Sequence, residues 1–400
     1  MKTTTRGVAM GGAAAVAALV LSLTGCASSQ PAAGGTDEPA GDPIPIGAIA
    51  SLTGPAVFPE ASSAAKAYFD VLNASGGIAG RPVEYIVQDD GGDPAKAAQA
   101  AKTLIEDDEV VLLGGAGSLL QCAVNAEYLA QQGVVDVPGT GVDPGCFASA
   151  AISPVNTGPY MGVTVSLFYL SEERGIDKIC YVQQSVPAFN PAFEGAVAHW
   201  MEVTGKELAA PVQFVNPTDD LTPVVSTVRA SGCEAVFFSL NEAPLVALLQ
   251  AAVTQGLDDE VVFMSQTSGF TDGIATAVGA SGQGLLANSE FLPYNSDSPE
   301  LDEWRTTMEA AGVPLTSFAQ GGYLAAKIIA DTLASIDGEI TRESVTEAFH
   351  ALTSFPTPWM GSDYAFGPGD THASNTASMI VELKDGAWTT VTGEWVRLPD

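Results

Sequence analysis

The chain of 400 residues contains few histidines and few basic side chains. It has 3 His and 15 Lys+Arg against 47 Asp+Glu, which gives a formal net charge of −32. None of His199, His350 and His372 stands in a metal-ligand spacing, so the sequence predicts no metal site. Such an acidic surface repels phosphate backbones and anionic lipid headgroups, which argues against nucleic-acid binding and peripheral membrane binding.

Common catalytic motifs are also missing. The sequence has no G-x-S-x-G elbow, no G-x-x-x-x-G-K-[ST] loop and no G-x-G-x-x-G fingerprint. Gly114, Gly115 and Gly117 follow a strand pattern and precede a helix pattern, but no lysine ends that loop, which disfavours a phosphate site. We therefore expect no enzyme activity and no cofactor, with a hydrolase of unknown type kept as a minor alternative.

The N-terminus has the pattern of an export signal. Lys2 and Arg6 precede an apolar run over residues 8–23, which is shorter than the roughly 20 residues of a membrane span. The run ends in Leu-Thr-Gly-Cys, which resembles the lipobox of bacterial lipoproteins and makes Cys26 the predicted lipidation site. We expect a signal peptide at residues 1–25 and a disordered tether at 26–43, small, polar and rich in Pro and Gly. An ordinary secretory signal is the alternative.

The most informative stretch runs from residue 73 to residue 105. Helical spacing before it is followed by Gly76 and Gly77, where a helix C-terminus needs a positive φ. VEYIVQ then alternates as a strand, and Asp93 and Pro94 form an N-cap with proline at the first helical position. The pattern N-x-x-G-G-I-x-G-R-P-V followed by D-D-x-x-D-P-x-x-A resembles the leucine/isoleucine/valine-binding family of bacterial solute-binding proteins.

Strand and helix patterns alternate along most of the chain, which predicts parallel sheets with helices on both faces. Strand patterns of a first series lie at 46–51, 83–88, 110–115 and 134–137, and those of a second series at 179–184, 212–215, 235–240 and 261–265. Further helix patterns lie near 301–311, 319–335 and 344–352, and further strand patterns at 378–383 and 388–391.

Two such series predict an α/β fold with two similar doubly wound parallel-sheet lobes. The resemblance implies the type I periplasmic-binding-protein fold, with three crossovers near 154–158, 287–292 and 360–364 forming a hinge. The ligand cleft would then lie at the carboxyl ends of the strands. The expected lobes are 44–156 plus 289–361 and 157–288 plus 362–400.

Four cysteines besides Cys26 allow three disulfide pairings. Cys180 and Cys233 begin the first and third strands of the second series, which are neighbours in a doubly wound sheet. Cys122 lies early in a helix and Cys146 in a loop at the same sheet edge. We favour the pairs 122–146 and 180–233.

The resemblance also suggests ligand-binding residues. The glycine loop GGAGSLLQ would offer free backbone N–H groups of a helix N-terminus and the Ser118 hydroxyl to a ligand carboxylate. The remaining candidates follow other strands: Thr140, Gly141, Phe189, Asn241, Gln266 and Thr267.

One departure from the family bears on the ligand. Amino-acid binders of this family place a glutamate after the fourth strand of the second lobe to accept the ligand's ammonium group. Here that loop is MSQTSGF, with no acid, and a buried ammonium without a carboxylate would cost several kcal/mol. We therefore expect a small carboxylate- or amide-bearing solute, amino-acid-like or aromatic. A strong preference for an ammonium ligand would instead indicate another acid, such as Glu242 or Asp143.

The sequence as a whole predicts a monomeric, lipid-anchored, extracytoplasmic solute-binding protein of an ABC importer. Its expected partners are the solute and the membrane permease with its ATPase. The main alternative is a sensor that passes its ligand-bound state to a signalling partner.

Overall fold

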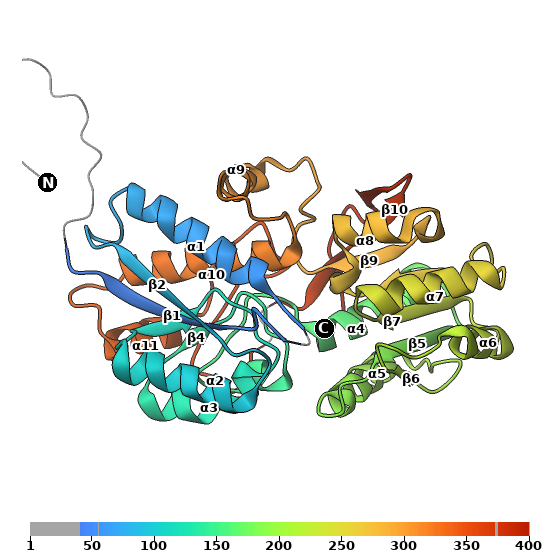
Figure 1. Cartoon of the computed structure of the whole chain (residues 1–400), viewed down its shortest axis with the longest axis horizontal. Coiled ribbons are helices and arrows are strands. Elements are labelled where there is room, and N and C mark those ends of the chain that lie inside the picture. The colour runs from blue at the N-terminus through green and yellow to red at the C-terminus, as the bar shows by residue number, and fades with distance from the viewer. Residues whose placement is uncertain (1–40, 55, 373–374, 400) are drawn as a thin grey trace, which may run out of the picture. The chain divides into compact units, whose positions relative to one another are not determined.

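The computed structural model describes residues 41–54, 56–372 and 375–399, and Figure 1 labels its main elements. The predicted signal peptide, Cys26 and most of the tether lie outside the described residues. Among the residues described, no helix combines the length and the apolar character that a membrane span requires.

The first sheet is parallel, with strand order β2-β1-β3-β4. Helices α1 and α10 pack together on one of its faces, and α2 and α3 on the other (Figure 1). The strands are β1 (Ile44–Ala50), β2 (Val83–Asp89), β3 (Leu112–Gly114) and β4 (Asp136–Val137). The helices are α1 (Pro59–Ala74), α2 (Pro94–Lys102), α3 (Gln121–Gln132), α10 (Ser317–Ala334) and α11 (Arg342–Ala351).

Small residues let α10 approach both α1 and the loop after β4. A Cβ at Gly322 would lie 1.9 Å from the backbone oxygen of Ala61, and one at Gly321 would lie 2.1 Å from that of Gly139. No side chain fits at either place. The two glycines therefore fix the start of α10 beside the loop that carries Thr140.

The second sheet begins with the parallel order β6-β5-β7-β8, which repeats the order of the first sheet, and continues through β9 to the antiparallel strands β10 and β11. Alternate residues of its strands face opposite layers: Tyr181 and Phe237 pack with α4 and α5, whereas Cys180 and Phe238 pack with α6 and α7. The strands are β5 (Ile179–Gln184), β6 (Gln213–Val215), β7 (Ala235–Ser239), β8 (Val262–Ser265), β9 (Leu286–Ser289), β10 (Ala377–Lys384), β11 (Ala387–Thr390) and β12 (Val396–Arg397). The helices are α4 (Pro159–Phe168), α5 (Asn190–Thr204), α6 (Thr222–Ser231), α7 (Glu242–Thr254) and α8 (Asp272–Val278). Helix α9 (Asp302–Ala311) contacts α1 of the first layer instead.

The predicted α/β fold is confirmed, with two corrections. The second sheet is not wholly parallel, because β10 and β11 add an antiparallel edge. The predicted second crossover, 287–292, starts too early, because β9 occupies Leu286–Ser289 and the chain leaves the sheet after it. LANS has little strand propensity, and hydrogen bonds from β8 and β10 on either side hold it in the sheet.

The chain passes between the two sheets three times: after β4, after β9 and before β10. The three connections are hydrogen-bonded to one another. The Tyr364 hydroxyl donates to the Ser153 carbonyl (2.8 Å), and the Leu292 N–H donates to the Trp359 carbonyl (2.8 Å). These bonds fix the three connecting segments relative to one another.

Candidate functional site

A small cavity lies where the carboxyl ends of strands from both sheets meet. Its volume is about 150 Å³, and apolar atoms contribute most of its surface. The first sheet supplies the loop after β4, and the second supplies the residues after β5, β7 and β8. Open α/β sheets bind ligands at this end of their strands.

Six of the seven predicted ligand-binding residues line this cavity. They are Thr140, Gly141, Phe189, Asn241, Gln266 and Thr267. Four phenylalanines supply apolar surface; two of these, Phe58 and Phe318, come from the starts of α1 and α10 and meet edge to face with ring centroids 5.5 Å apart. The sequence did not predict Phe58, Phe193 and Phe318 as lining residues, because they lie on helices or before them rather than after strands.

Ser118, the seventh predicted residue, is not among the described residues that line this cavity. Its hydroxyl donates to Asp90, and the same oxygen accepts the backbone N–H groups of Leu120 (3.2 Å) and Gln121 (3.0 Å). Asp90 also accepts the Ser51 hydroxyl (2.8 Å).

The N-terminus of α3 is therefore occupied by the protein's own groups. The Leu119 N–H donates to the Ser51 hydroxyl (3.0 Å). In the loop after β4, burial raises the pKa of Asp143 to about 6, while the backbone N–H groups of Ala123, Gly145, Cys122 and Cys146 oppose that shift. Three N–H groups that were predicted to be free in this loop, those of Leu119, Leu120 and Gln121, thus donate to the hydroxyls of Ser51 and Ser118.

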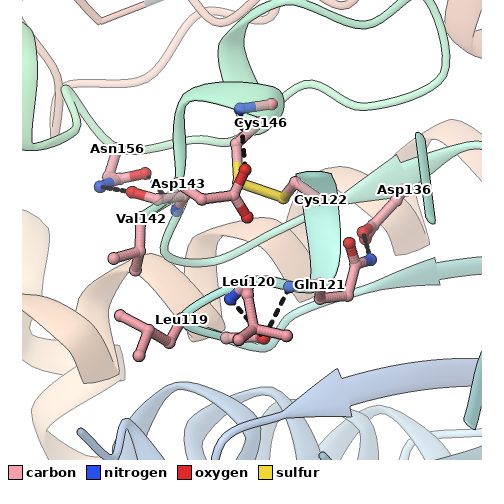
Figure 2. Close-up of a disulfide and its surroundings, with 12 residues drawn as sticks. Leu119, Leu120, Gln121, Cys122, Asp136, Val142, Asp143, Cys146 and Asn156 are labelled. Carbon is pink, nitrogen blue, oxygen red and sulfur yellow. Dashed lines mark hydrogen bonds between the residues drawn. A yellow bond between two sulfur atoms is a disulfide. The ribbon is translucent and has the colours of Figure 1, made fainter. Parts of the chain in front are cut away.

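The Cys122–Cys146 disulfide ties α3 to the loop after β4 (Figure 2). Both cysteines are buried, and the loop between β4 and Cys146 carries Thr140, Gly141 and Val142 to the cavity. The second disulfide, Cys180–Cys233, lies in the core beneath α6 and α7. Both pairings are those expected from the sequence.

One cluster of described residues has the composition of a metal site, namely Cys122, Asp143 and Cys146. The two sulfur atoms are joined in a disulfide, so neither is a thiolate that could hold a metal ion.

An acid that the sequence analysis did not identify lines the cavity. Glu290 follows β9 directly and is only 4% exposed. Its Oε1 accepts the Asn156 side-chain amide (3.1 Å) and the Gly158 backbone N–H (2.8 Å). Burial raises the pKa of Glu290 to about 7, and these two hydrogen bonds oppose the shift. Had β9 been recognised, Glu290 would have been identified as a residue at the carboxyl end of a strand.

Asn156 connects this acid with the predicted residue Gly141. Its Oδ1 accepts the Gly141 N–H (2.7 Å), and its Nδ2 donates to the Gly141 carbonyl (3.2 Å) as well as to Glu290. The two acids considered earlier lie elsewhere. Glu242 is exposed at the start of α7, and Asp143 is buried behind the loop that lines the cavity.

Comparison with known proteins shows the family of this chain. The sequence profile described as periplasmic binding protein matches residues 43–387. Leu/Ile/Val-binding protein homolog 3 of Brucella melitensis biotype 1 is 23% identical over 318 residues, which cover 77% of this chain and 83% of that protein.

Solved structures show the same fold. An ABC-transporter solute-binding protein of Rhodopseudomonas palustris HaA2, in complex with p-hydroxybenzoic acid, has a TM-score of 0.74 at 19% identity, over 90% of this chain and 98% of that one. A branched-chain amino acid transporter substrate-binding protein of Streptococcus pneumoniae, in complex with isoleucine, has a TM-score of 0.72 at 14% identity, over 87% and 99%. Because the profile match spans most of the chain, the protein belongs to the periplasmic binding protein family, as its resemblance to leucine/isoleucine/valine-binding proteins predicts.

Proposed function

We propose that this protein is the extracytoplasmic solute-binding lipoprotein of an ABC importer, and that it holds one small amino-acid-like or aromatic solute between two lobes. The lobes would be 44–156 plus 289–361 and 157–288 plus 362–400. The observation that carries the proposal is a small, mostly apolar cavity lined by strand ends of both sheets. A solute that touches both sides stabilises their approach, which a permease can recognise.

Thr140, Gly141, Phe189, Asn241, Gln266 and Thr267 are the proposed ligand contacts. Ser118 is proposed to act indirectly, because its hydroxyl is bonded to Asp90 and the start of α3. It would hold Leu119, the next residue, against the cavity.

A thermal-shift and calorimetric screen of amino acids, aromatic acids, amines and amides tests solute binding. A compound present at 100 times its Kd adds roughly 2.7 kcal/mol to the free energy of unfolding. Thr140→Val should weaken binding of any hit, whereas Thr227→Val, at an exposed position on α6, should not. Recovery of the hit unchanged after long incubation supports a binding protein, and chemical conversion of the hit would support a hydrolase.

Membrane anchorage is tested separately. Lipidation at Cys26 should place the protein in the detergent phase, because two or more acyl chains give stable anchoring. Cys26→Ser removes the lipidation site, so it should release the protein or leave the precursor unprocessed. Unchanged membrane retention of Cys26→Ser would contradict the lipobox. Pull-down from solubilised membranes should recover a permease and its ATPase, whereas recovery of a membrane kinase would favour the sensor.

A further inference from the structure

The cavity has an unbalanced charge. Among the described residues that line it, Glu290 is the one ionisable side chain, and no Lys, Arg or His is present. A ligand carboxylate would therefore meet a buried acid with no cation to offset it. Like charges at short range in a poorly solvated site repel strongly.

The anion-binding groups of the first sheet are already occupied. Asp90 accepts the hydroxyls of Ser51 and Ser118, and the helix N–H groups that a carboxylate would use donate to those same hydroxyl oxygens. A ligand carboxylate at this place would displace bonds that the protein makes for itself. The cavity thus offers a fixed acid but no prepared site for a second anion.

Two hydrogen bonds fix the orientation of the Glu290 carboxyl group. Asn156 and Gly158 both donate to Oε1, so the carboxyl group is held in one orientation at the start of α4. Asn156 is itself fixed by two hydrogen bonds to the Gly141 peptide. Burial without a cation raises the pKa of Glu290 to about 7, and a cationic partner beside the group would favour its charged form.

The apolar surface fits a small body. A cavity of about 150 Å³ lined by aliphatic and aromatic side chains holds a molecule of the size of benzene. Phe58 and Phe318 on the first side, and Phe189 and Phe193 on the second, provide aromatic surface that also attracts cations.

We propose that the cavity selects a solute with a protonated amine on a small apolar body, that Glu290 is the counter-ion of this ammonium group, and that a ligand carboxylate is not required. The inference rests on the proposed solute-binding function and narrows its ligand class. It replaces the preference for carboxylates and deaminated acids that the loop after β8 suggested. Glu290 reaches the cavity from β9, a different strand from β8, which carries that loop.

The test uses matched probes with one skeleton each. The aromatic set is 2-phenylethylamine, phenylalanine and 3-phenylpropionate, and the aliphatic set is 3-methylbutylamine, leucine and 4-methylpentanoate. Calorimetry on the wild-type protein should show that in at least one set the amine binds about thirtyfold or more tighter than the acid. That factor corresponds to roughly 2 kcal/mol for a buried charge pair.

Glu290→Gln keeps an oxygen that can accept from Asn156 and Gly158 but removes the charge. In this variant the amine-to-acid affinity ratio should fall to within about threefold of unity. Glu242→Gln removes the same charge at the exposed start of α7, outside the cavity lining, and should keep the wild-type ratio.

Each outcome decides the matter. Binding of the acids without the amines overturns the proposal but leaves solute binding intact. If the preference of the wild-type protein for amines persists in Glu290→Gln, Glu290 is not the counter-ion of the ammonium group. Failure of every probe to bind overturns the amine assignment, and failure of the wider screen as well would overturn the proposed function. If Glu290→Gln does not fold, the amine-to-acid ratio of the wild-type protein decides alone.

Discussion

The two sides of the cavity differ in where their hydrogen-bonded polar groups lie: behind the lining on the first side and within the lining on the second. On the first side, Ser51, Asp90 and Ser118 bond to one another and to the start of α3, and a disulfide ties that helix to the loop after β4. On the second side, Asn241 and Gln266 line the cavity, and the Gln266 amide donates to the Pro159 carbonyl (2.6 Å). Glu290 lines the cavity from the connection that follows β9. Both sheets use the same strand order, so topology alone does not set this difference. The comparison indicates a rigid first side and a selective second side.

Removal of each disulfide should give the largest difference in effect between the two sides of the cavity. Cys122→Ala/Cys146→Ala and Cys180→Ala/Cys233→Ala open loops with sequence separations of 24 and 53. Each should lower the free energy of unfolding by about 3–4 kcal/mol in the chain-entropy model, as urea denaturation would show. Only the first pair should also weaken ligand binding, because it frees the loop that carries Thr140. Equal loss of affinity in both variants would contradict a rigid first side.

Glu290 should make the unliganded protein less stable as pH rises. Its native pKa is about 7 against an ordinary value of 4.5, so between these pH values the native state binds more protons than the unfolded state. The free energy of unfolding therefore falls with rising pH over that window, by at most about 3 kcal/mol from this group. Asp136 on the first side, whose pKa burial also raises to about 7, adds a similar decline from its ordinary value of 3.8.

Urea denaturation at pH 5 and pH 8 distinguishes the two acids. Glu290→Gln and Asp136→Asn should each reduce the difference in the free energy of unfolding between pH 5 and pH 8. An amine ligand should offset the decline in the wild-type protein and in Asp136→Asn but bind weakly to Glu290→Gln. If the free energy of unfolding of Glu290→Gln still falls by the wild-type amount between pH 5 and pH 8, the pKa of this carboxyl group is not raised in the native state.

Phe189→Ala should weaken binding by about 1–2 kcal/mol, or roughly five- to thirtyfold, through lost apolar contact. Phe189 is half-buried and lines the cavity, so the unliganded protein should lose little stability. Calorimetry and thermal unfolding of the same sample measure both effects. A large loss of stability with unchanged affinity would make Phe189 a packing residue.

Ser118→Ala should give the smallest effect on binding. It removes one hydroxyl from the network with Asp90 and should lower the free energy of unfolding by about 1–2 kcal/mol. Affinity should change less than about threefold, because the hydroxyl is bonded within the protein. A loss of affinity without a loss of stability would restore Ser118 as a direct ligand contact and blur the difference between the two sides.

Most of the site could be predicted because it follows strands with clear patterns. ICYVQQ, AVFFSL and VVFMS are apolar runs with defined ends, and Phe189, Asn241 and Gln266 come after them and line the cavity. Glu290 could not be found in this way, since LANS lacks a strand pattern. Phe318 lies on a helix whose placement depends on the glycine contacts of α10 with α1 and with the loop after β4.

The sequence by itself determined the alternation of strands and helices, the pairing of the cysteines and the family, because those depend on periodicity, spacing and local caps. Only the tertiary structure decided which polar groups face the cavity. Asp90 lies 28 residues before Ser118, and Glu290 lies 134 residues after Asn156, and each pair meets only when the sheets form. Whether a buried hydroxyl or carboxyl group is free for a ligand depends on such distant partners, which no local pattern records.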